Sequence, residues 1–294
     1  MTNANPSRSG KTHRQENFPV ASLLVRAEHR SIILAFYYFV RAADDIADSS
    51  TLTPSQKIER LDRMEAALLG NDSDEKVPQA IVLRGALAGR GLSPRHAQDL
   101  LKAFRLDATK LRYADWNDLI SYCAYSAMPV GRFVLDVHGE SPSTWPASDA
   151  TCAALQIINH LQDCGEDYRD LDRVYLPEDI MRKHGAAIEA LGAKTASPEL
   201  RACITELAGR CADLLREGDA LVGEIADWRL RLEISVIQAL ATRITGVLRI
   251  KDPLGEETHL GKWQVGATGL LAALRGAMRG SAGASRPTAT GSRI

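Results

Sequence analysis

The chain has 294 residues, of which 45% are apolar, 25% are charged and only 5% are aromatic. A chain of this length can bury a large core, so its fold does not have to depend on disulfides or a structural metal. The net charge of −1 disfavours a globally basic protein, and no nucleic-acid partner is expected. Abundant Ala and Leu with few aromatics favour helices over an aromatic-rich β-sandwich.

The sequence also predicts where the protein resides. Its five cysteines are odd in number and none forms a C-x-x-C pair, which argues against a disulfide framework or a zinc site. The longest strongly apolar run covers only 32–40, whereas a membrane-spanning helix needs about 20 residues. The first 15 residues lack the apolar segment of a secretory signal. These features predict a cytoplasmic protein.

Apolar residues recur at helical spacing through most of the chain, and alternating strand patterns are almost absent. Thr53 and Pro54 form a typical helix start, because Thr caps the first turn and Pro fits the first helical position. Pro129 lies inside a helical pattern and is expected to kink it. The expected helices span 31–47, 54–69, 93–106, 116–137, 149–167, 198–222, 228–250 and 261–279.

We therefore expect an all-α protein with one helical domain over 15–279. Residues 1–14 are polar and rich in Ser and Asn, which is typical of a flexible N-terminal arm. Residues 280–294 are rich in Gly, Ser, Ala and Thr, which is typical of a disordered tail. No long linker and no internal repeat divides the part between them.

A first polar face is predicted on the helix over 31–47. Residues four apart share a helix face, so Asp44 and Asp48 are expected to stack, and Tyr37 and Arg41 extend the same face. The rest of this segment is mostly apolar. Such a face could also be a solvent-exposed surface, and for one cluster alone the two interpretations are about equally good.

A second polar face is predicted over 149–167. Asn159, Asp163 and Asp167 are spaced four apart, and Gln156 extends the face backwards. Here a solvent-exposed surface is a weaker explanation, because 151–167 contains no Lys or Arg to pair with the acids. His160 lies off this face and is expected to be a packing histidine rather than a ligand.

Two such faces, on helices that meet in one bundle, predict a site for a cation and an anion together. Crowded carboxylates without counter-charges are costly unless something positive binds them. Carboxylate and amide oxygens suit Mg²⁺, which commonly bridges to phosphate oxygens. Arg41 offers a planar fork for a phosphate. With apolar walls around it, the site is expected to bind a diphosphate attached to a hydrocarbon.

These motifs resemble those of the squalene/phytoene synthases, which act on prenyl diphosphates head to head. The likeness extends over about 18–262, and the N-x-x-x-D-x-x-x-D spacing differs from that of linear prenyl synthases and terpene cyclases. It implies a class I isoprenoid synthase bundle with a central apolar cavity. The matching segments are 41–48 (RAADDIAD), 156–167 (QIINHLQDCGED) and 173–177 (RVYLP).

Within this family the chain is most similar to the bacterial hydroxysqualene-forming subgroup. The similarity rests on 16–22 (ENFPVAS), on 122–132 (YCAYSAMPVGR) and on Lys262 with Trp263. It implies that presqualene diphosphate ionises and that water captures the rearranged cation, giving hydroxysqualene and diphosphate. Mg²⁺ is the implied cofactor, and no NADPH is expected. Enzymes before and after this step of squalene synthesis are possible partners.

The implied site uses oxygen ligands for the metal and a cation for the phosphate. Arg41 is expected to bind a phosphate oxygen, with Tyr37 and Lys262 as weaker candidates, and Gln156 is expected to touch substrate. Glu166 is a weaker candidate for the metal. Asp44 and Asp163 are expected to act in catalysis through the metal they hold. The expected Mg²⁺ ligands are Asp44, Asp48, Asn159, Asp163 and Asp167.

The ring of Tyr122, which matches a tyrosine of the family, could stabilise a carbocation while its hydroxyl orients a water. The alternative is a core tyrosine with a satisfied hydroxyl. Pro129 should free the carbonyl of Tyr125, and we hypothesise that this carbonyl or the Ser126 hydroxyl holds the attacking water. The hydrocarbon tunnel, or simply the core, is expected to include Phe18, Val130, Val134 and Leu155.

Alternatives stay open at this stage. The chain could instead couple two prenyl diphosphates to presqualene diphosphate, dehydrosqualene or phytoene, or it could be a non-catalytic helical subunit. After Glu257 the sequence contains basic but no acidic residues, so its end could touch an anionic inner membrane surface. A last bundle helix with a soluble tail is the preferred interpretation of that end.

Overall fold

The computed structural model describes residues 26–71 and 77–258. Within these ranges it contains helices and no β-strand, with one isolated bridge between Arg112 and Val174, so the all-α prediction is confirmed. In the same ranges, no helix is long and apolar enough to cross a membrane. The predicted arm, the helix over 261–279 and the tail lie outside the described residues, as do Phe18 and Lys262.

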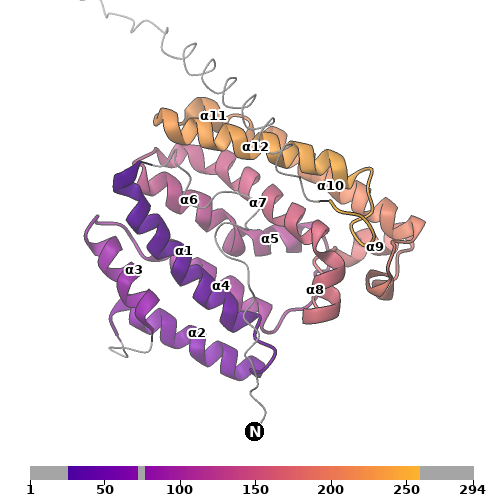
Figure 1. Cartoon of the computed structure of the whole chain (residues 1–294), viewed down its shortest axis with the longest axis horizontal. Coiled ribbons are helices and arrows are strands. Elements are labelled where there is room, and N and C mark those ends of the chain that lie inside the picture. Colours follow the sequence, from indigo (N-terminus) through magenta and orange to yellow (C-terminus); the bar gives the residue numbers. More distant parts are fainter. Residues whose placement is uncertain (1–25, 72–76, 259–294) are drawn as a thin grey trace, which may run out of the picture.

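The first four helices form one side of the molecule (Figure 1). They share a core with α6 that includes Phe39, Leu61, Leu83 and Leu101. Helix α2 begins as predicted: Thr53 accepts a hydrogen bond from the backbone of Gln56, whose side chain bonds back to the Thr53 backbone. The helix α3 was not predicted. The four are α1 (Ala27–Ala47), α2 (Pro54–Leu69), α3 (Pro78–Ala88) and α4 (Arg95–Asp107).

The segment 116–137, predicted as one kinked helix, forms two helices, α5 (Trp116–Ser126) and α6 (Met128–Val137). The chain leaves helical geometry at Ala127, where φ is −126° and ψ is −46°. Pro129 lies in the first turn of α6, where its missing N–H costs no helical hydrogen bond. The proline therefore starts a new helix rather than bending an existing one.

The predicted helix over 149–167 is also divided, into α7 (Trp145–Gln162) and α8 (Cys164–Leu171). The division is at Asp163, with φ −99° and ψ 8°. The i to i+4 hydrogen bonds nevertheless continue, from the Asp163 N–H to the Asn159 carbonyl and from the Asp167 N–H to the Asp163 carbonyl, both 2.9 Å. The second polar face thus crosses a local distortion rather than a turn.

The C-terminal helices cover the other side of the bundle. The predicted helix over 198–222 ends earlier, at Gly218, and α9 was not predicted. Short 3₁₀ turns occupy Pro142–Thr144 and Ile188–Gly192. The helices are α9 (Glu178–His184), α10 (Pro198–Gly218), α11 (Leu221–Glu224) and α12 (Trp228–Leu248).

Helix α7 is central, because it packs against α5, α6, α10 and α12. Figure 1 shows it between the α10–α12 side and the α1–α4 side of the molecule. Its buried face, with Ala153, Ile157 and Leu161, belongs to the largest core cluster. The face that points away from this core is therefore the one available to line a site.

Candidate active site

An apolar cavity of about 330 Å³ lies between α1, α6, α7 and α12. Helix α1 lines it with residues between Ile33 and Val40, and α7 lines it with residues between Ser148 and Leu155. The three described tunnel candidates of the sequence are on its wall, and so is Tyr37, which was expected to bind phosphate. The helices that carry the two polar faces therefore face each other across this cavity, as expected. These lining residues are Tyr37, Val130, Val134 and Leu155.

Both polar faces begin where the apolar lining ends. On α1, Val40 lines the cavity and Asp44 lies one helical turn beyond it. On α7, Leu155 lines the cavity and Asn159 lies one turn beyond it. One end of the cavity is thus flanked by acids and amides from two helices, and the rest of it is mostly hydrocarbon.

The first polar face contains acids that are paired with arginines. Arg41 contacts Asp44 at 3.1 Å and Asp45 at 3.2 Å. Asp48 accepts a hydrogen bond of 2.6 Å from Arg173, whose guanidinium also donates to the Ala47 carbonyl. The acids of this face therefore have counter-charges both from Arg41 on the same helix and from Arg173, which arrives from a distant part of the chain.

Asp44 nevertheless remains in an unfavourable environment for a carboxylate. Its side chain is 35% exposed but closely surrounded by protein. Burial, followed by the charge of Asp48, raises the pKa of the Asp44 carboxyl to about 7, and Arg41 opposes this shift only in part. A bound cation would relieve this excess of negative charge.

The second polar face has no arginine or lysine within 151–167. His160 lies 3.7 Å from Asp167 and would be a counter-charge only when protonated. Gln156 contacts the other ring nitrogen of His160 at 3.0 Å, so its amide is directed to the histidine and does not line the apolar cavity. His160 is buried, as the packing interpretation predicts, but it also contacts a metal-ligand candidate.

A buried hydrogen-bonded group lies beside these faces, centred on Asp107 at the end of α4. The Tyr122 hydroxyl donates to Asp107 at 3.0 Å and the Tyr175 hydroxyl donates to it at 3.2 Å. His160 stacks on the Tyr175 ring with 3.4 Å between centroids. Burial raises the pKa of Asp107, while Arg173 and the Tyr122 hydroxyl act in the opposite direction.

Sequence reasoning missed the central place of Asp107. A lone Asp at the end of an amphipathic helix has no distinctive signal. Arg173 and Tyr175 were noted only as parts of a family motif, and that motif was the signal that could have found their roles. In the structure, the hydrogen bonds of these residues connect α1, α4, α5 and the segment after α8.

Tyr122 and Ser126, which were expected to orient or hold the attacking water, differ in how their hydroxyl groups are hydrogen-bonded. The Tyr122 hydroxyl gives its hydrogen to Asp107 and the residue is buried, which matches the alternative of a satisfied core tyrosine. The Ser126 hydroxyl oxygen is buried and finds no hydrogen-bond partner among the described residues. It lies at the last turn of α5, directly before the break at Ala127. A buried hydroxyl of this kind is a possible position for a bound water.

The oxygen ligands predicted for Mg²⁺ do not form a preassembled cage. Among the described residues, the one group of at least three His, Cys, Asp or Glu with ligand atoms within 4.8 Å of one another is His29, His138 and Asp227. That group contacts Arg26 and Arg90, each at 2.9 Å, which would repel a cation. A looser set of carboxylates fits Mg²⁺, which keeps waters and takes phosphate oxygens as ligands.

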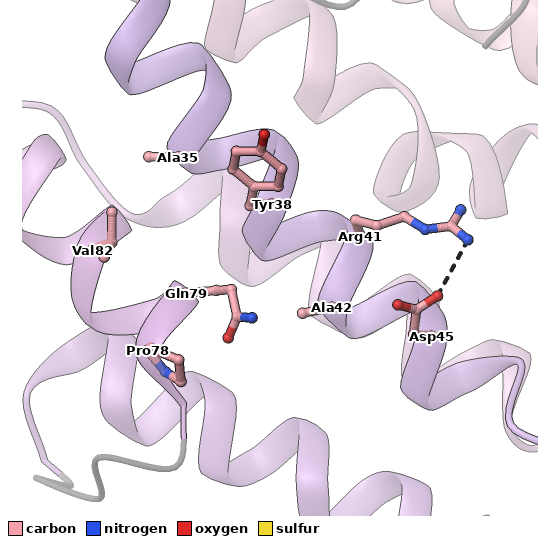
Figure 2. Close-up of a pocket in the computed structure, with 8 residues that line it drawn as sticks. All are labelled: Ala35, Tyr38, Arg41, Ala42, Asp45, Pro78, Gln79 and Val82. Carbon is pink, nitrogen blue, oxygen red and sulfur yellow. Dashed lines mark ion pairs between the residues drawn. The ribbon is translucent and has the colours of Figure 1, made fainter. Parts of the chain in front are cut away.

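A second hollow, of about 400 Å³, lies between α1 and α3 (Figure 2). Tyr38 and Val82 are exposed on its rim, and the Arg41 guanidinium turns from it toward Asp45. Its lining contains no residue of the second polar face. We therefore place the candidate site at the apolar cavity on the opposite side of α1.

Comparisons with known proteins agree with this geometry. The family model described as squalene/phytoene synthase matches residues 11–264. A hydroxysqualene synthase from Rhodopseudomonas palustris is 60% identical over 88% of both chains. One from Sinorhizobium fredii is 52% identical over 96% of this chain and 97% of the relative.

Solved structures show the same fold. A crystal structure described as squalene synthase HpnC from Alicyclobacillus acidocaldarius aligns with a TM-score of 0.69 and 31% identity, over 78% of this chain and 86% of that one. A dehydrosqualene synthase aligns with a TM-score of 0.74 and 21% identity, over 86% and 88% of the two chains. From the family model and these relatives, the chain belongs to the squalene/phytoene synthase family.

Proposed function

We propose that this protein is a hydroxysqualene synthase, which ionises presqualene diphosphate and lets water capture the resulting cation. One observation carries this proposal: the polar faces of α1 and α7 flank the same end of an apolar cavity. A diphosphate fits the acidic end with its metal, and a hydrocarbon fits the rest. The relatives with 60% and 52% identity are described as hydroxysqualene synthases, which supports the choice of reaction.

The residues present fit Mg²⁺, because the donor set offers only carboxylate and amide oxygens. The proposed ligands are Asp44 on α1, Asp48 directly after it, Asn159 on α7, Asp163 between α7 and α8, and Asp167 on α8. Mg²⁺, when bound, neutralises the negative charge that develops on the leaving diphosphate. No NADPH takes part in this proposal, because water rather than hydride quenches the cation.

The cationic side chains are proposed to hold the diphosphate. Arg41 exchanges part of its contact with Asp44 and Asp45 for a phosphate oxygen, to which its fork is suited. Tyr37, Lys262 and Gln156 are further candidates for contact with substrate. Arg173 keeps Asp48 in place on the first polar face.

Water capture requires a place for one water beside an otherwise dry cavity. The water oxygen forms a bond to the cationic carbon, one O–H bond breaks, and the proton passes to the diphosphate that the same reaction releases. The Tyr122 ring is proposed to stabilise the cation, since its hydroxyl is already bonded to Asp107. The buried Ser126 hydroxyl, or the Tyr125 carbonyl, is proposed to hold the water.

The variants Ser126→Ala and Pro129→Ala test the water position. Both are expected to lower the yield of hydroxysqualene relative to the amount of diphosphate released. Unchanged hydroxysqualene yield in both would reject this position. Pro129→Ala also tests whether the start of α6 holds the site in shape.

The function itself is tested by a paired incubation with Mg²⁺ and without NADPH. One sample receives presqualene diphosphate and the other farnesyl diphosphate, and lipid products are identified by mass spectrometry. We expect hydroxysqualene from the first and no product from the second. Condensation of farnesyl diphosphate would assign a coupling activity instead, and no product in either sample would favour a non-catalytic subunit.

We also propose that the protein acts in the cytoplasm and touches the membrane at most peripherally. The basic segment that could mediate contact lies almost entirely outside the described residues. Flotation with anionic liposomes, for the full chain and for a chain ending at 257, tests this contact. The enzymes that supply presqualene diphosphate and consume hydroxysqualene are the proposed functional partners.

A further inference from the structure

The outer sides of α1 and α3 form a surface of uncharged residues, which we call the α1–α3 face. On each helix its residues are spaced three or four apart, so they share one side. The two helices pack against each other, and the two sides therefore make one continuous surface (Figure 2). The residues of the face are Ser31, Leu34, Tyr38 and Ala42 of α1 and Pro78, Val82 and Gly85 of α3.

The neighbouring helices α2 and α4 present charged side chains to solvent, as surface helices usually do. On the α1–α3 face, by contrast, the side chains that stand out are apolar or aromatic: Tyr38 is 50% exposed and Val82 is 59% exposed. A contiguous exposed surface of this kind is typical of an interaction site. The exposed charged residues of the neighbours include Glu59, Arg60, Asp62 and Arg63 of α2 and Arg95 and Lys102 of α4.

Gly85 gives an independent reason to expect a partner at this face. It lies inside α3, where a glycine is less favourable than an alanine because it loses more backbone freedom on folding. It is exposed, and a Cβ atom added to it would meet nothing within 4 Å beyond its own helix. Packing within the chain therefore does not require a glycine here. A glycine on the outer side of a helix does allow another molecule to approach the backbone closely.

The α1–α3 face contains both a hollow and projecting side chains. The hollow is the one of about 400 Å³ between the two helices, and Ala35 and Ala42 line it (Figure 2). Tyr38 and Val82 project from its rim. A patch that holds both shapes can be complementary to a second copy of itself, because a twofold axis brings the projections of each copy to the hollow of the other.

The charges at the two ends of the face also suit a second copy. Arg41 and Asp45 form an ion pair of 3.2 Å at one end. At the other end Arg90, which follows α3, donates to the Glu28 carbonyl. Each end thus carries both signs, and the net charge of the chain is only −1, so two copies do not repel each other strongly. An anionic membrane fits this face less well, because Asp45 is exposed and Arg41 is already paired.

We infer that two copies of this chain associate through the α1–α3 face, with Tyr38 and Val82 of each copy packed at the hollow of the other. The face is about 26 Å long from Glu28 to Asp45 and, for two packed helices, about 20 Å wide. Its area is therefore about 500 Å² per copy, which is at the lower end of the range for specific interfaces. We expect a reversible dimer with a dissociation constant in the micromolar range.

Analytical ultracentrifugation of the full chain, from about 1 µM to about 100 µM, measures this association. The average mass is expected to rise with concentration toward twice the 32.0 kDa of one chain. Val82→Glu should raise the dissociation constant at least about 10-fold, because it places like charges in an uncharged contact. Ile250→Glu is the matched control: it adds the same charge at a residue that is 83% exposed and lies after α12, and it should leave the dissociation constant unchanged.

Gly85→Glu separates association from folding. Glutamate is a better helix former than glycine and its Cβ meets no neighbour, so the melting temperature of the monomer should stay equal or rise. The dissociation constant should nevertheless rise about 10-fold or more, because the new charged side chain occupies the space of the second copy.

Two results would overturn the inference: a monomer at every concentration, or a dimer that neither Val82→Glu nor Gly85→Glu weakens. If the monomer instead floats with anionic liposomes and Val82→Glu abolishes flotation, the face belongs to a membrane contact and not to a second copy. These outcomes are independent of the proposed function, since Val82 and Gly85 neither line the apolar cavity nor belong to the polar faces.

Discussion

The two polar faces of the site contain similar acids but differ in how those acids are balanced. On α1, each of the two metal-ligand candidates contacts an arginine: Asp44 contacts Arg41, and Asp48 contacts Arg173. On α7 and α8, the segment 151–167 contains no Lys or Arg. The first face is thus partly neutralised by arginines, whereas the segment of the second face supplies only His160, 3.7 Å from Asp167, as a basic side chain.

The backbone differs in the same way. The first face lies on one unbroken helix, and the second crosses a departure from helical geometry at Asp163. The α1 acids are held in place by packing and ion pairs before any ligand arrives. The comparison teaches that arginines from two parts of the chain fix the first face, whereas the second face carries its acids without Lys or Arg in its own segment; we therefore propose that the second face depends more strongly on a bound metal and diphosphate.

The largest effect is expected from Asp163→Asn on the second face. Removing this carboxylate should lower metal-dependent diphosphate release by about 10²–10³-fold, as for other groups that stabilise developing charge. We expect Mg²⁺ with inorganic diphosphate to raise the melting temperature of the unmodified protein, and we expect Asp163→Asn to abolish this rise. Asp170→Asn, an exposed acid on α8, is the matched control and should leave both unchanged. Full activity of Asp163→Asn would remove the second face from the mechanism.

Asp107→Asn tests the buried hydrogen-bonded group in which Asp107 accepts from the Tyr122 and Tyr175 hydroxyls. The Tyr122 and Tyr175 hydroxyls would lose a shared carboxylate acceptor, so the free energy of unfolding should fall by about 1.5–3 kcal/mol. Urea unfolding measures this loss. Tyr122→Phe and the double variant complete a mutant cycle, and strictly additive losses would contradict a connected network.

Asp48→Asn, compared with Asp167→Asn, tests whether the acids of the two polar faces differ in their contribution to the free energy of unfolding. It leaves the buried Arg173 guanidinium without its carboxylate, and because the Asp48 side chain is 40% exposed, a loss of about 1–2 kcal/mol is expected. Asp167→Asn on the second face should cost less stability in the absence of metal, because within the described residues the ion-pair contact of Asp167 is the 3.7 Å approach of His160. Equal losses in the two variants, measured by urea unfolding without Mg²⁺, would contradict the distinction between a face that is paired with arginines and a face with no Lys or Arg in its own segment.

The smallest effect is expected from Thr53→Ala. This change removes the side-chain cap of α2 and should lower the free energy of unfolding by about 1 kcal/mol, with no change in kcat/KM. Ser55→Ala, at an exposed position in the same turn, is the control. A loss of activity in Thr53→Ala would show that the α1–α2 connection influences the first polar face.

Much of this protein was predictable from local patterns in its sequence. The start of α2 at Pro54 follows from its capping residues, and the four-residue spacing of Asp44 with Asp48 places both on one helix face. The divisions at Ala127 and Asp163 were not predictable with the same certainty. Apolar periodicity continues through both, and a short irregularity barely changes it.

The sequence by itself determined the helical class, the two polar faces and the family, because these depend on residues a few positions apart. Only the tertiary structure decided that Arg173 neutralises Asp48, 125 residues away, and that Asp107 receives two tyrosine hydroxyls. It alone also placed Glu233 of α12 on the wall of the apolar cavity. Such pairings depend on how α7 packs against its neighbours, and helix periodicity contains no information about which distant residues will meet.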